Sequence, residues 1–130
     1  PLQVLWEKFI VLSALAGITS AAQTRPKELL KYPDARTMFC NAMEESLAVG
    51  LAKGINLPDD LVQNSLKYIE SLTDFQNSMQ GDYEAGRATE LEALSGAVIR
   101  LGKQIGVKTP VHEFLYSVLL PHKDGFPAVA

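Results

Sequence analysis

The first 22 residues are apolar on nearly every side of a helical projection. Between Leu2 and Ala22 only Glu7 and Lys8 are charged, and the few polar residues follow neither helical nor alternating spacing. A helix that is hydrophobic all round belongs inside a bundle rather than on its surface, and Gly17 would let another backbone approach closely. The pattern therefore predicts a buried central helix over Leu2 to Ala22.

The same segment also fits a second interpretation. From Phe9 to Ile18 only Ser13 is polar, and Ser20-Ala21-Ala22 follows, an order typical of a signal peptide. Against that interpretation, Glu7 cancels the charge of Lys8. The apolar run is also shorter than the roughly 20 residues that a membrane span needs. We therefore expect a core helix and no contact with a membrane.

Helical periodicity continues through the middle of the chain. A short helix or turn is expected over Arg25 to Leu30, and a long helix over Ala35 to Lys53 that ends at Gly54. Leu57-Pro58-Asp59-Asp60 suits the first turn of a further helix. The expected buried positions of these two longer helices are Met38, Phe39, Ala42, Met43, Leu47 and Leu51, then Leu61, Val62, Leu66, Ile69 and Leu72.

Polar residues and glycines interrupt the pattern from Thr73 to Arg87, which predicts a long connection of the kind that often has a function. Thr89 and Glu92 form a capping-box pattern, which predicts one helix from there to Ile105, ended by Gly106. Pro110 opens a last helix through Leu120. We therefore expect an all-α, single helical bundle domain over residues 1–120 and a tail over 121–130.

Composition and charge narrow the function classes. A length of 130 residues suits one domain, and 47% hydrophobic residues allow a core. The twelve Lys and Arg are scattered and the net charge is −3, so the basic surface that binds nucleic acid is missing. Cys40 is the only cysteine, which excludes an internal disulfide and fits a reducing cytoplasm. Because the chain opens on Pro1, we expect a domain cut from a longer protein.

Four residues could carry chemistry: Lys8, Ser78, Asp82 and Glu90. A cation at a helix N-terminus is disfavoured by roughly 0.3–1 kcal/mol. Lys8 therefore either extends to water and pairs with Glu7 or another acid, or is held beside a reacting oxygen as a proton donor. Glu90 suits a first helical turn in any case, and Ser78 and Asp82 are ordinary turn residues. Spacing alone leaves both interpretations open.

Other site types find little support in the sequence. His112 and His122 lie far from Cys40, and their spacing matches no cluster of metal ligands. Neither GxGxxG nor a P-loop occurs, so the chain offers no dinucleotide site of the usual kind by itself. We expect no metal site.

Four motifs in register resemble the C-terminal domain of the ketopantoate reductases, the 2-dehydropantoate 2-reductases. They are Leu5-Trp6-Glu7-Lys8-Phe9, Asn77-Ser78-Met79 with Asp82, Gly86-Arg87-Ala88-Thr89-Glu90-Leu91 and Gly106-Val107-Lys108-Thr109-Pro110. The resemblance implies the helical fold of the 6-phosphogluconate dehydrogenase C-terminal-like domains. It also implies a two-domain oxidoreductase whose N-terminal Rossmann domain, absent from this chain, binds most of an NADPH cofactor.

The resemblance also assigns roles. Lys8 matches the general acid that protonates the ketone of a 2-keto acid, and Glu90 matches the acid that contacts substrate or cofactor ribose. Ser78 matches the residue that binds the substrate carboxylate. The implied reaction is reduction of ketopantoate to pantoate for pantothenate and coenzyme A synthesis, and the isolated domain is expected to be inactive.

One departure from the family limits the substrate. The family commonly has asparagines where this chain has Leu12 and Ala16, so we expect an apolar wall beside Lys8 and a relaxed or altered preference. Ser13 and Thr19 are candidates to compensate. A helical interaction or dimerisation module that keeps the fold without the activity is the alternative. The sequence leaves open whether the apolar helices meet the Rossmann domain or a second copy in a homodimer.

Overall fold

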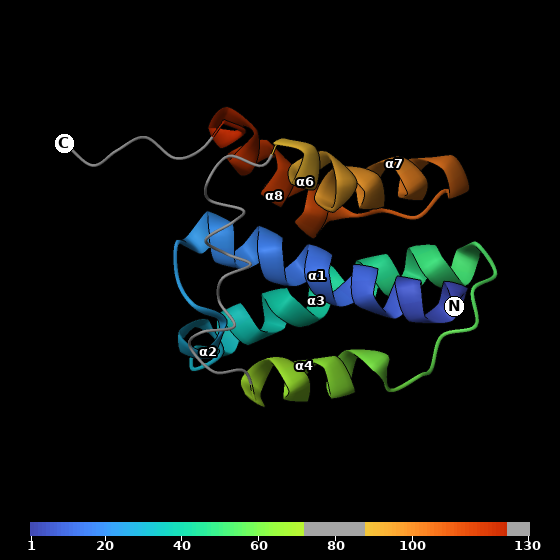
Figure 1. Cartoon of the computed structure of the whole chain (residues 1–130), viewed down its shortest axis with the longest axis horizontal. Helices are drawn as coiled ribbons and strands as arrows, with labels where there is room; N and C mark the ends of the chain where they lie inside the picture. Colours follow the sequence, from blue (N-terminus) through green and yellow to red (C-terminus); the bar gives the residue numbers. More distant parts are fainter. Residues whose placement is uncertain (72–87, 125–130) are drawn as a thin grey trace.

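The computed structural model describes residues 1–71 and 88–124, and this part of the chain contains helices and no β-strand. The result confirms the all-α fold class. Figure 1 shows the helices, which in chain order are α1 (Leu2–Ala22), α2 (Pro26–Leu29), α3 (Pro33–Ala52), α4 (Leu61–Ser71), α6 (Ala88–Ala93), α7 (Ser95–Ile105), α8 (Pro110–Leu119) and the 3₁₀ helix η2 (Leu120–His122).

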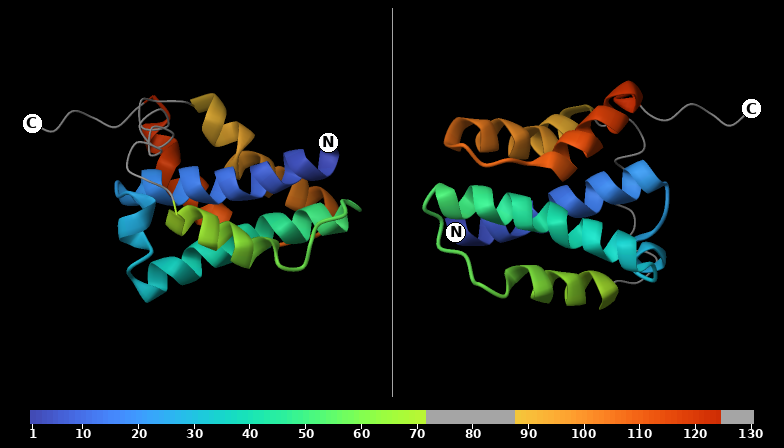
Figure 2. Two further views of the ribbon diagram at one scale, coloured as in Figure 1. Left: turned by 60° about the horizontal axis from the view of Figure 1, so that its bottom comes forward. Right: turned by 180° about the vertical axis from the view of Figure 1, so that it is seen from behind.

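Helix α1 forms the middle of the bundle. It lies beside α3, with α6, α7 and α8 on one side of this pair and α4 on the other (Figures 1 and 2). The eight residues from Ser13 to Ser20 are all buried, which confirms the predicted central helix. The apolar run from Phe9 to Ile18 is short, but the whole of α1, with 21 residues, would by length and composition also suit a membrane span. In this fold its apolar second half is instead covered by protein.

Helix α3 supplies the other half of the core. Phe39, Ala42 and Met43 are fully buried against α1, as the periodicity predicted. Two other predicted positions are wrong, because Met38 is 42% exposed and Leu51 is 51% exposed. At about 100° per residue both side chains point well away from the centre of the buried face.

The predicted glycine stops of two helices are confirmed. Gly54 has a φ of 87°, and just past α3 the N–H of Ile55 donates to the carbonyl of Gly50 at 3.0 Å. This bond satisfies one of the carbonyls that a helix end leaves free. Gly106 ends α7 in the same left-handed conformation, with a φ of 76°.

The predicted single helix from Thr89 to Ile105 is wrong, since it consists of two helices that meet at Leu94. Leu94 has φ −106° and ψ −95°, values outside the helical region. The break lets α6 pack Leu91 against α1 while α7 buries Val98 in the main core. Helix α6 begins at Ala88, one residue before the predicted N-cap Thr89.

Gly17 allows close packing in the middle of α1. A Cβ atom at this position would lie 2.9 Å from Cδ1 of Leu115 in α8 and 3.4 Å from Oγ of Ser95 in α7. The predicted approach of another backbone is therefore wrong, because the groups nearest to Gly17 are the side chains of Leu115 and Ser95. This contact holds α8 against the central helix.

Candidate active site

A cavity of about 360 Å³ opens between α1 and α4 beside Lys8. Helix α1 contributes Glu7, Lys8, Val11 and Leu12 to its wall. Helix α4 contributes Leu61, Asn64, Ser65 and Tyr68. The volume falls within the range of about 300–1,000 Å³ that small-molecule sites occupy.

The Lys8 side chain is exposed at this cavity. Within residues 1–71 and 88–124 no carboxylate forms an ion pair with Lys8. Its neighbour Glu7 instead accepts a hydrogen bond from Nε2 of Gln3 at 3.5 Å. Lys8 therefore extends to water, as one of the two interpretations expected, but it does not pair with Glu7. In the described part of the chain its ammonium group remains available to a ligand in the cavity.

The two positions at which the chain departs from the family have different environments in the structure. Leu12 lines the cavity, which confirms an apolar wall one helical turn beyond Lys8. Ala16 is 1% exposed and packs with Leu91 and Leu119, so it is not part of that wall and the prediction is wrong for this residue. The apolar surface beside Lys8 depends on Leu12.

Ser13 and Thr19 are used inside the bundle. Ser13 Oγ donates to the carbonyl of Ile10 at 3.3 Å and lies 3.4 Å from Oγ of Ser46. Thr19 Oγ1 donates to the carbonyl of Leu15 at 2.6 Å. Both residues are buried and neither lines the cavity, so they do not replace the polar groups that Leu12 lacks.

Glu90 is half-buried in the first turn of α6. The next residue, Leu91, packs on Ala16, which lies about 12 Å beyond Lys8 along the axis of α1. Glu90 is not part of the cavity wall, so the described structure does not bring Lys8 and Glu90 together. Ser78 and Asp82 lie outside the described residues, and the roles of all four residues stay predictions.

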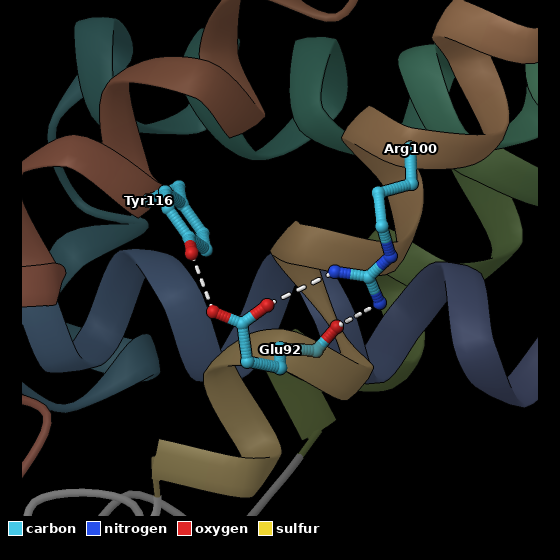
Figure 3. Close-up of polar contacts among 3 residues, drawn as sticks. All are labelled: Glu92, Arg100 and Tyr116. Atoms are coloured by element: carbon cyan, nitrogen blue, oxygen red, sulfur yellow. Dashed lines mark hydrogen bonds and ion pairs between the residues drawn. The ribbon is translucent and has the colours of Figure 1, made fainter.

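A polar cluster that the sequence did not predict fixes the helix that carries Glu90 (Figure 3). Arg100 Nη1 donates to Oε2 of Glu92 at 3.0 Å, and Nη2 donates to the backbone carbonyl of Glu92 at 2.7 Å. The hydroxyl of Tyr116 donates to Oε1 of the same carboxylate. This bond is the main reason why the pKa of Tyr116 is raised. The cluster joins α6, α7 and α8, next to a second hollow of about 600 Å³ that contains neither Lys8 nor Glu90.

His112 is fully buried between α3, α7 and α8. Its Nε2 lies 2.9 Å from the carbonyl of Ala42, which can only accept, so Nε2 carries the hydrogen. Nδ1 then accepts from the hydroxyl of Ser95 at 3.0 Å. Burial lowers the pKa of His112 to about 4, because it disfavours the charged ring. The ring is therefore neutral at pH 7 and has a structural role.

The start of α8 beside His112 is capped by Glu45 of α3. Its carboxylate accepts from the backbone N–H groups of Val111 at 2.7 Å and His112 at 3.0 Å. Burial raises the pKa of Glu45, and these two hydrogen bonds oppose that effect. Across residues 1–71 and 88–124, no three His, Cys, Asp or Glu side chains gather as a metal-binding group.

Comparison with known proteins finds relatives over nearly the whole chain. Residues 2–123 match the family model described as ketopantoate reductase PanE/ApbA C terminal. The 2-dehydropantoate 2-reductase of Pyrobaculum aerophilum is 29% identical over 114 residues, which are 88% of this chain and 41% of that protein. The chain therefore spans less than half the length of this relative.

Solved structures agree on the fold. A dimeric ketopantoate reductase from Staphylococcus aureus superposes with a TM-score of 0.82 at 22% identity, covering 93% of this chain and 43% of that one. D-mandelate dehydrogenase in complex with NADH gives a TM-score of 0.77 at 26% identity, covering 94% and 50%. With the family match over residues 2–123, these likenesses show that the chain belongs to the ketopantoate reductase PanE/ApbA C-terminal family.

Proposed function

We propose that the full-length protein is an NADPH-dependent 2-keto acid reductase of the ketopantoate reductase type, in which this domain supplies the general acid. The observation that carries the proposal is Lys8, an exposed lysine without a carboxylate partner in the described chain, at a cavity of about 360 Å³. Ketopantoate is the substrate that the named relatives suggest. In this proposal the reaction takes place in the cytoplasm.

Lys8 acts on the ketone oxygen of the bound 2-keto acid. The nicotinamide, when bound, supplies the hydride. As the carbonyl carbon accepts that hydride, negative charge develops on the oxygen, and an ammonium within hydrogen-bonding distance stabilises this charge and then transfers its proton. The product is a 2-hydroxy acid, and Lys8 recovers its proton from solvent, to which it is exposed.

The described residues fit only part of a nicotinamide dinucleotide. The carboxylate of Glu90 can accept hydrogen bonds from ribose hydroxyls, and α6 leaves its side chain half-exposed. Residues 1–71 and 88–124 contain no strand and hence no strand–loop–helix unit to hold the pyrophosphate. The Rossmann domain that we expect upstream would supply it, and the isolated domain would be inactive.

The test is Lys8→Ala in the full-length protein with NADPH and ketopantoate. We expect turnover to fall by roughly 10²–10⁴-fold, the range that general acid catalysis contributes. Lys53→Ala, which removes an exposed lysine outside the cavity, is the matched control and should retain activity. Unchanged turnover in Lys8→Ala would refute the assignment.

A helical interaction or dimerisation module is the second candidate. The exposed apolar residues Leu2, Val4 and Leu5 at the start of α1 favour it, and the named Staphylococcus relative is dimeric. Light scattering of the full-length protein measures its oligomeric state. A dimer that reduces no 2-keto acid with either nicotinamide cofactor would favour this candidate over the enzyme.

A further inference from the structure

We propose that the cavity between α1 and α4 receives the side chain of the 2-keto acid, and that Leu12 makes it select side chains without a hydroxyl group. The inference rests on the proposed function and adds the substrate class. The cavity surface is mostly apolar although Asn64, Ser65 and Tyr68 line it. A pocket of this kind gains free energy mainly by removing apolar surface from water.

Leu12 follows Lys8 by four residues in α1. Residues four apart on a helix are neighbours on the same face, and both side chains line one cavity. A ketone oxygen that accepts a hydrogen bond from Lys8 therefore places the adjoining carbons of the substrate near Leu12. The side chain of the substrate, rather than its carboxylate, meets this apolar surface, because burying a carboxylate against leucine would be costly.

A hydroxyl group on those carbons would lose hydrogen bonds to water at this wall. Leu12 offers no donor or acceptor in return, and an unpaired hydroxyl costs about 1–3 kcal/mol by protein mutational data. Apart from Glu7 and Lys8, the polar lining residues Asn64, Ser65 and Tyr68 all belong to α4, so none of them lies on the helix that carries Leu12. An apolar pocket rejects a hydroxylated isostere by about 10²-fold at most, so we expect a preference of roughly 10–100-fold.

The experiment compares two substrates that differ by one hydroxyl. The full-length protein is assayed for kcat/KM with ketopantoate and with 2-keto-3,3-dimethylbutanoate, the same carbon skeleton without the hydroxyl group. The wild type should prefer the second acid by roughly 10–100-fold. Leu12→Asn, which supplies a donor and an acceptor at the wall, should shift the ratio toward ketopantoate by at least about tenfold.

Leu51→Asn is the matched control, since it makes the same chemical change at an exposed leucine outside the cavity. It should leave the substrate ratio unchanged. Thermal unfolding of each variant shows whether it folds, and the wild-type ratio decides the question by itself if Leu12→Asn does not fold.

The outcomes separate the two proposals. Reduction of both acids with ketopantoate preferred, or a ratio that Leu12→Asn does not move, overturns the role of Leu12 and leaves the reductase intact. The same result is expected if another segment of the full-length protein fills the cavity. Failure to reduce either acid overturns the proposed function, and the role of Leu12 with it.

Discussion

The buried ring of His112 makes the stability of the domain depend on pH. Its pKa is lowered from 6.5 to about 4 in the folded chain, mainly by burial. Between these two values the unfolded chain binds a proton that the folded chain does not, so folding is favoured as pH rises. The contribution is fully present above about pH 6.5 and is lost as pH falls toward 4.

The magnitude follows from the two pKa values. A tenfold change in a protonation equilibrium is about 1.4 kcal/mol, so the difference between 6.5 and about 4 corresponds to about 3 kcal/mol at most. Such a loss is a large share of the 5–15 kcal/mol by which domains are usually stable. Glu45 acts in the opposite direction, because its pKa is raised and its contribution declines as pH rises above 4.5.

The assay is urea unfolding of the 130-residue chain at a series of pH values from 7 to 4, for the wild type and His112→Gln. Glutamine keeps an N–H donor for the carbonyl of Ala42 but does not titrate. Effects of Glu45 and other carboxylates are nearly common to both proteins and cancel in the difference. We expect the advantage of the wild type over the variant to shrink by about 3 kcal/mol across this range. Parallel stability curves would refute the reasoning.

Two further predictions concern packing and the polar cluster. Gly17→Val should lower the free energy of unfolding in urea by about 1–3 kcal/mol, because the valine side chain overlaps Leu115. Gly17→Ala should lower it by less, because the atom that its Cβ meets is the end of a flexible side chain. Glu92→Gln should lower the pKa of Tyr116 toward its usual value in a spectrophotometric titration. It should change stability by no more than about 1 kcal/mol, because the ion pair with Arg100 is half-exposed. A Tyr116 pKa that Glu92→Gln leaves unchanged would contradict the hydrogen bond.

The local sequence was sufficient to predict the structure where a single helix determines its own environment. The composition of Leu2 to Ala22 leaves no polar face, so only an interior position satisfies it, and the structure places α1 there. Gly54 and Gly106 stop their helices because left-handed backbone is accessible to glycine without strain. The same locality brought Lys8 and Leu12 to one cavity, since a single helical turn separates them.

Residues whose environment is set by distant segments escaped prediction. His112 appeared in the sequence as an isolated histidine, and its partners Ala42 and Ser95 come from other helices. Ala16 follows Leu12 by one turn, but α6 and α8 cover it through Leu91 and Leu119. The periodicity of a single helix does not indicate which other helix will cover each of its turns.

The position of Glu90 in helix α6 is also set by distant segments. This helix has six residues, too few to be stable alone, so its orientation depends on tertiary contacts. Those contacts are Leu91 on Ala16 and the hydrogen bonds of Glu92 with Arg100 and Tyr116, on either side of the break at Leu94. Glu92 and Arg100 lie two turns apart in sequence, so a continuous helix would have kept them separate. The position of Glu90, next to Leu91 and two residues before Glu92, therefore depends on a break at Leu94 that the sequence signals only by the Ser95-Gly96 pair after it.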